Sequence, residues 1–316
     1  MTRFTAAIIA IALTAGCTNG VADDFSKVLP DDRVKINMPI DDAGGLRSNV
    51  GDTAEYYSFT AQVTHDVNTL IGQVLDTVEY IADFDPTWSD DQDNTAVWGP
   101  WEDGGLEAYM AVAYDEGADT YTWALEYRNA GETDADWVTV FAGDVAEGAT
   151  DEVGAGRLAI DFDAFEQFAD EDEDDITGVF YVEYDVTEDT TSAYAGFEGF
   201  SENGSEVTDI AYFYDQEHNE GGMMDLVYWA DLTGNEVQEA NIVRSRWHKD
   251  GDGRSDVYIT DGDFGVLVYS ATECWKQDHA VVFYENNADL VTNGDVGMCT
   301  FAEPDWNDSD DAPVGR

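Results

Sequence analysis

The residues of this chain that come closest to a chemical motif are an acidic cluster with one histidine. They are His248, Asp250, Asp252 and Asp256. Calcium and other hard cations bind several oxygen ligands from one loop, as this cluster could supply. The spacing is incomplete, because Arg254 stands where a third acid is needed and no Glu follows at the twelfth position. A hairpin turn rich in Asp and Gly explains the same residues. We therefore predict no metal site, and keep Asp250, Asp252 and Asp256 as the alternative.

A second candidate site is cationic. Arg244 and Arg246 are two residues apart, so in a strand their side chains lie on the same face, and Trp247 follows directly. In so acidic a chain we expect the two arginines to pair with carboxylates on adjacent strands. If their face instead lines a cavity, Arg244, Arg246 and Trp247 would bind an anionic headgroup or a carboxylate-bearing ligand.

The sequence carries no motif of a known catalytic type. It has no nucleophile elbow, phosphate-binding loop, dinucleotide fingerprint or paired-cysteine metal motif, and its four histidines are far apart. Carboxylates are too numerous for any one pair to indicate glycosidase chemistry. We predict a protein that is not an enzyme and that needs no cofactor.

The charge of the chain excludes one class of partner. There are 69 acidic residues against 13 basic ones, which gives a net charge of −56. Such a surface repels nucleic acid, so we expect no nucleic-acid partner. An acid-rich, lysine-poor surface is typical of proteins from a salty habitat, where ions screen the repulsion between like charges. A cation-binding surface is the alternative interpretation.

The N-terminus predicts export. Arg3 precedes a short apolar run that ends in residues 13–17, Leu-Thr-Ala-Gly-Cys. These are the parts of a secretory signal, and the run is too short to span a bilayer. Residues 13–17 resemble a bacterial lipobox, which implies a signal peptide over 1–16, lipid attachment at Cys17 and a membrane partner. No Asp follows Cys17, so the resemblance favours the outer membrane; an ordinary secretory signal is the alternative.

The remaining cysteines fit an oxidising compartment. With Cys17 lipidated, Cys274 and Cys299 are left as a pair, and we predict a disulfide between them. Such a bridge closes a loop of roughly 25 residues and stabilises the fold by about 3 kcal/mol in the chain-entropy model. Two free buried thiols are the alternative.

One long helix is predicted over residues 52–83. Its apolar residues recur at steps of three and four, as on one helical face: Val63, Val67, Leu70, Ile71, Val74, Val78 and Ile81. Asp52 and Glu55 have the spacing of a capping box, and Pro86 ends the helix. An apolar stripe of this length must be buried, and a sheet is the only large partner available.

The rest of the chain reads as strands. From about residue 95 to 285, apolar residues alternate with polar ones, and Gly, Asn and Asp turns interrupt them every ten or so residues. We predict a mainly β (α+β) fold: a large antiparallel meander forming a curved sheet or barrel, with the long N-terminal helix packed against it. Residues 17–51 are a lipidated tether and lead-in, 52–304 a single domain, and 305–316 an acidic disordered tail.

Several short stretches resemble a group of uncharacterised bacterial outer-membrane lipoproteins. They are Arg244-Ser245-Arg246-Trp247, Gly253-Arg254-Ser255-Asp256, Thr272-Glu273-Cys274-Trp275, Trp98-Gly99-Pro100 and residues 158–162. The resemblance is scattered over the mature domain and implies no activity, since none is known for the group.

The function expected from these observations is a non-enzymatic structural or interaction role in the cell envelope, with another envelope protein as partner. One alternative is a half-barrel carrier that binds a lipid or another hydrophobic small molecule. A second alternative is a calcium-dependent or glycan-binding surface lipoprotein, since flat aromatic side chains on a sheet can stack on sugars.

Overall fold

The computed structural model describes most of the chain after the N-terminal segment. The described residues are 20–29, 34–35, 38, 50–90, 94–146, 148–150, 153–168, 176–231, 234, 237–260, 269–288 and 290–304. The predicted signal peptide, the lipidation site Cys17 and the predicted acidic tail lie outside them, so those expectations stay predictions.

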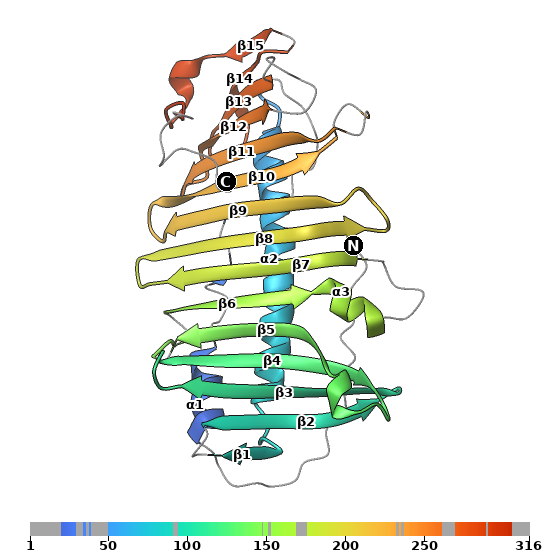
Figure 1. The fold of residues 1–316 in the computed structure, drawn as a ribbon. Helices are drawn as coiled ribbons and strands as arrows, with labels where there is room; N and C mark the ends of the chain where they lie inside the picture. The colour runs from blue at the N-terminus through green and yellow to red at the C-terminus, as the bar shows by residue number, and fades with distance from the viewer. Residues whose placement is uncertain are drawn as a thin grey trace. The chain divides into compact units, whose positions relative to one another are not determined.

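The strands follow one another in the sheet in the order of the sequence (Figure 1). Within the described residues there are fifteen, which run antiparallel: β1 Trp88–Asp90, β2 Thr95–Asp103, β3 Leu106–Asp115, β4 Thr120–Asn129, β5 Val138–Ala146, β6 Gly154–Asp161, β7 Ile176–Val186, β8 Thr190–Glu202, β9 Thr208–Glu217, β10 Gly221–Ala230, β11 Glu239–His248, β12 Gly253–Thr260, β13 Tyr269–Trp275, β14 Val281–Asn286 and β15 Val291–Gly294. The predicted antiparallel meander is confirmed. The sheet is not closed, because β1 and β15 are its two end strands, so the barrel alternative is wrong.

The long helix is present as α2, Glu55–Ala82, inside the predicted range. The described residues also form the helices α1 Gly20–Val28 and α3 Phe162–Phe165 and the 3₁₀ turns η2 Asp134–Asp136, η3 Glu166–Phe168 and η4 Val296–Met298. Helix α1 lies within residues 17–51, which we predicted to be a tether and lead-in. No helix of the described residues is both long and apolar enough to cross a membrane.

The chain divides into two compact units. Unit 1 comprises residues 1–34, 71–188 and 197–207, and unit 2 comprises residues 35–70, 189–196 and 208–316. Helix α2 contributes its residues up to Leu70 to unit 2 and the rest to unit 1.

Unit 1 is organised around one apolar face of its strands. Met110, Trp123 and Phe180 on β3, β4 and β7 are buried there, as alternation of facing side chains requires. Helix α1 contacts β2 and β3, and its fully buried Phe25 packs against Tyr121 with 6.1 Å between ring centroids. This contact explains why a nine-residue helix is stable where local sequence did not predict one.

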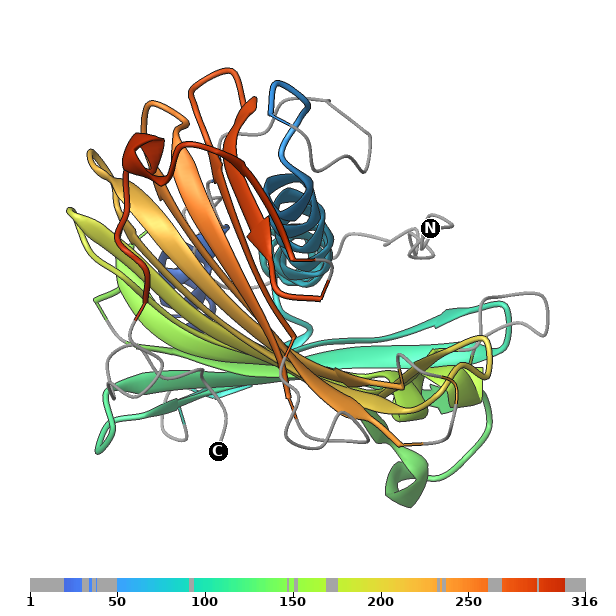
Figure 2. The ribbon, with the colours of Figure 1, turned by 90° about the horizontal axis from the view of Figure 1, so that it is seen from above.

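In unit 2 the first turns of α2 pack on the strands β10–β13. Thr60 and Ser245 share a hydrogen bond of 2.6 Å, and Tyr57 packs against Trp275 with ring centroids 5.3 Å apart. Figure 2 shows α2 on one face of the strands β12–β14 and η4 on the other. The two faces of this part of the sheet therefore have different partners.

The N-terminus of α2 is capped from a strand. Glu273 on β13 accepts hydrogen bonds from the backbone N–H groups of Glu55 and Tyr56, at 2.8 and 3.1 Å. The expected capping box assigned the first of these donors to Asp52. The structure corrects that assignment, because the sheet brings a buried carboxyl oxygen to the free N–H groups at the start of the helix.

Aromatic rings lie across glycines on neighbouring strands. Trp123 is paired with Gly143 between β4 and β5, and Trp247 with Gly222 between β11 and β10. A Cβ atom at Gly143 would overlap the Trp123 ring, and one at Gly222 would come within 2.9 Å of Trp247. The missing side chain is what lets each ring lie flat on the sheet.

Candidate functional site

The two arginines singled out from sequence share one carboxylate. Arg244 on β11 is paired directly with Asp225 on β10. Its Nη2 and Nε atoms donate to the Asp225 carboxylate at 2.8 and 3.0 Å, and Arg246 Nη1 donates to the same group at 2.9 Å. Arg244 and Asp225 are only 1% and 2% exposed. The expected pairing with a carboxylate on an adjacent strand is confirmed.

A second buried ion pair continues this row on β12. Asp256 lies opposite Arg244 in the register, on the same face of the sheet. Arg254 Nε and Nη2 donate to its two oxygens, each at 2.7 Å, and the Thr272 hydroxyl donates to Asp256 Oδ1 at 2.7 Å. Two nitrogens on two oxygens form the bidentate geometry that makes arginine–carboxylate pairs strong.

Trp247 does not belong with Arg244 and Arg246. Neighbouring side chains in a strand point to opposite faces, so Trp247 lies on the face that α2 covers, beside Ser245. It is 1% exposed and stacks on Tyr214 with ring centroids 6.2 Å apart. The structure thus divides the predicted trio: the arginines join the ion-pair network and the tryptophan joins the core.

The weak metal candidates are also separated. Asp256 is occupied by Arg254, whereas Asp252 accepts a hydrogen bond from Thr300 and lies 3.3 Å from His248 Nδ1. Among the residues that the structure describes, no three His, Cys, Asp or Glu side chains are arranged to hold a metal ion.

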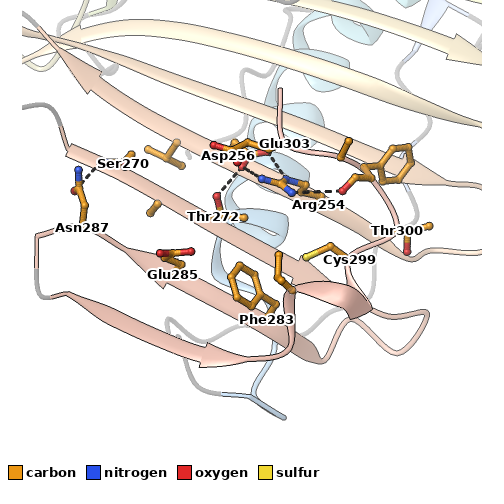
Figure 3. A pocket seen from close by; sticks show the side chains of 15 residues that line it. Arg254, Asp256, Ser270, Thr272, Phe283, Glu285, Asn287, Cys299, Thr300 and Glu303 are labelled. Carbon is orange, nitrogen blue, oxygen red and sulfur yellow. Dashed lines mark hydrogen bonds and ion pairs between the residues drawn. The ribbon is translucent and has the colours of Figure 1, made fainter. Parts of the chain in front are cut away.

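The second ion pair forms the floor of a pocket of about 580 Å³, which lies wholly in unit 2 (Figure 3). Its sheet wall carries Arg254, Asp256, Ser270, Thr272, Phe283, Glu285 and Asn287. Its other wall is formed by residues 295–304, which we call the strap; the strap supplies Val296, Cys299, Thr300, Phe301, Ala302 and Glu303.

Several contacts fix the strap to the sheet. The predicted disulfide is present between Cys274 on β13 and Cys299, with 5.4 Å between the Cα atoms. Arg254 Nη1 donates to the Phe301 carbonyl oxygen at 3.4 Å, and the Phe301 ring lies 4.5 Å from the His248 ring. The disulfide and the contacts of Phe301 therefore hold the strap against the sheet without a ligand.

The charged side chains of the pocket differ in whether they are paired within the protein. The pocket lining contains no histidine, lysine or free thiol. Asp256 is committed to Arg254 and Thr272, which leaves it without the freedom of a general base. Two other carboxylates, Glu285 on β14 and Glu303 on the strap, are exposed at the rim.

Sequence reasoning missed most of this pocket. The alternation of residues on β12 and β13 places Asp256 and Thr272 on outward-facing positions, but only the strand register brings them together. Nothing in residues 295–304 distinguishes the strap from an ordinary loop, apart from the second cysteine of the disulfide. Cys299 was the one usable signal.

Comparisons of the chain with protein-family models, curated protein sequences and solved structures found no match. The resemblance to the lipoprotein group stays a prediction.

Proposed function

We propose that this protein is an exported, lipid-anchored protein of the cell envelope that binds a small polar ligand in the unit 2 pocket without converting it. The pocket itself carries the proposal: about 580 Å³ over a floor of neutralised charges. Cavities of roughly 300–1,000 Å³ with a few fixed polar groups are typical of small-molecule sites.

The rigidity of the pocket supports binding. Arg254, Asp256 and Thr272 hold one another in place, and the disulfide fixes the strap above them. Little conformational freedom is left to lose when a ligand enters, which favours affinity. The absence of a catalytic motif in the sequence and of a free acid–base pair on the floor argues against chemistry at this site.

The polar lining favours a polar ligand over a lipid. The ion pair and the Thr272 hydroxyl cover the floor, and transferring such groups from water to contact with a hydrocarbon chain is unfavourable. In unit 2, the space between α2 and the sheet is filled by large side chains such as Tyr57, Trp247 and Trp275, each at most 1% exposed. The carrier alternative would need a cavity there.

The location rests on sequence and on the disulfide. Residues 13–17 resemble a lipobox, so Cys17 would carry the anchor, and we place the protein in the outer membrane. A disulfide persists in an oxidising compartment, which agrees with export.

Native mass spectrometry of the full chain in detergent tests the binding. The protein is incubated with a small-molecule extract of the expressing cells, beside two variants. Ala302→Trp fills the pocket from the strap, and Ala118→Trp places the same side chain on an exposed turn of unit 1. We expect one added mass below about 1 kDa on the wild type and on Ala118→Trp, and none on Ala302→Trp. No added mass on any protein, or the same mass on Ala302→Trp, would refute the proposal.

A further inference from the structure

The charge left unpaired in the pocket is of one sign, and this restricts the ligand further than size does. Arg254 is the one cationic side chain of the lining, and each of its three side-chain nitrogens already donates: two to Asp256 and one to Phe301. The Thr272 hydroxyl also donates to Asp256. Three of the five N–H groups of Arg254 are thus used within the protein, and its charge is paired with that of Asp256.

Two carboxylates at the rim of the pocket differ from Arg254, because no partner is found for them within the described residues. Glu285 and Glu303 approach the pocket from β14 and from the strap (Figure 3). Within the part of the chain that the structure describes, neither carboxylate accepts a hydrogen bond or pairs with a cation. Because Arg254 neutralises Asp256, these two groups give the pocket a net negative charge.

Apolar groups line the same pocket. Phe283 is 4% exposed on the sheet wall, and Phe301 and Val296 face it from the strap. Aromatic rings and an aliphatic side chain contact a carbon skeleton favourably, and a ring face attracts an organic cation. A bare metal ion would use neither the volume nor these side chains.

We propose that the pocket selects a small organic cation, whose ammonium groups pair with Glu285 and Glu303 and whose carbon chain packs on Phe301 and Val296. This rests on the proposed binding function and names its ligand class. An anion is disfavoured because the only guanidinium is already paired. A neutral polyol could donate to the two carboxylates but would leave their charge uncompensated.

Three probes of equal length separate these classes. 1,6-Diaminohexane, 1,6-hexanediol and adipate carry a cationic, a neutral and an anionic group at each end of the same six-carbon chain. Each is titrated into the full chain in detergent by isothermal calorimetry. We expect saturable one-to-one binding of the diamine, with weaker binding of the diol and no binding of adipate. Affinity for the diamine should fall with added NaCl, because rim carboxylates are screened.

Variants then locate the binding. Glu285→Gln and Glu303→Gln should each weaken the diamine about tenfold, since each removes one charge-assisted hydrogen bond. Glu198→Gln, an exposed site on β8 outside the pocket, removes the same charge and should change nothing. It controls for general attraction to a protein of net charge −56.

The outcomes distinguish the ligand class from the binding function. Diol affinity equal to that of the diamine, abolished by Ala302→Trp, would overturn the cationic class and leave a polar binding site. The organic-cation proposal would also be overturned if all three Glu→Gln variants reduced diamine binding equally. It would be overturned as well if Glu285→Gln and Glu303→Gln left diamine binding unchanged. If none of the probes binds, the proposal of an organic cation is refuted. If Ala302→Trp also retains the mass captured from the extract, the proposed binding function is refuted as well.

Discussion

The cap of helix α2 predicts an unusual pH dependence of stability. Glu273 is fully buried, and its Oε2 accepts both backbone hydrogen bonds from Glu55 and Tyr56. Its Oε1 accepts none within the described residues. Burial raises the pKa of Glu273 to about 8 from 4.5, against the smaller, opposite effect of the two backbone hydrogen bonds. The folded protein therefore keeps this carboxyl protonated at neutral pH.

The sign and size of the effect follow from proton linkage. Between pH 4.5 and pH 8 the folded state binds this proton and the unfolded state releases it. The free energy of unfolding thus has the full contribution of Glu273 below pH 4.5 and loses it as the pH rises to about 8. At 1.36 kcal/mol per unit of pKa difference, the loss amounts to about 5 kcal/mol.

Glu273→Gln tests this reasoning, because the amide stays neutral and its oxygen can still accept from the two N–H groups. We expect the variant to match the wild type near pH 5 and to exceed its free energy of unfolding by several kcal/mol at pH 9, with a ceiling of about 5. The measurement is urea unfolding followed by tryptophan fluorescence from pH 5 to 9. Comparing variant with wild type cancels the pH dependence that the other acids contribute.

Glu285→Gln is the matched control, since it removes an exposed carboxylate from the neighbouring strand. The difference in free energy of unfolding between this variant and the wild type should not grow with pH. A difference between Glu273→Gln and the wild type that stays constant from pH 5 to 9 would refute the assignment of a raised pKa. A variant less stable than the wild type at pH 9 would show that the cap needs the charge.

Four further changes have expected outcomes. Asp225→Asn leaves two arginines without their carboxylate and should cost about 3–5 kcal/mol in urea unfolding, against less than about 1 kcal/mol for Asp144→Asn at a solvent-exposed pair. Cys299→Ser should lower stability by about 3 kcal/mol relative to the oxidised wild type, and a reductant should remove the difference. Gly143→Ala should cost about 1–3 kcal/mol because its Cβ overlaps Trp123. Cys17→Ser should move the protein from the membrane to the soluble fraction on cell fractionation; retention in the membrane would contradict lipid anchoring.

Local patterns were sufficient for the main elements. The three- and four-residue spacing within residues 52–83 identified α2, and the alternation from Leu106 to Tyr114 identified β3. Both signals depend on side-chain periods that a strand or helix imposes on its own sequence. Helix α1 has the same spacing at Val21, Phe25 and Val28, but over only nine residues, and it owes its stability to contacts such as that of Phe25 with Tyr121.

The site could be predicted only where its partners are close in sequence. The shared face of Arg244 and Arg246 follows from a spacing of two, but their partner Asp225 depends on the register between β10 and β11. Grouping Trp247 with them treated sequence neighbours as spatial neighbours, which a strand contradicts by alternating faces. The cap is more distant still: Glu273 and Glu55 are 218 residues apart.

The composition of the chain and the chemistry of its pocket are linked through the positions of its few cations. Only 13 basic residues accompany 69 acids, and unit 2 places Arg244, Arg246 and Arg254 in the network with Asp225 and Asp256. Burying a charged carboxylate without a partner is unfavourable. The few guanidinium groups of this region therefore pair with the buried carboxylates of Asp225 and Asp256. Carboxylates at the rim can remain charged in water without a guanidinium partner. The pocket consequently offers paired charge at its floor and negative charge at its mouth, an arrangement that favours a ligand with its own positive charge.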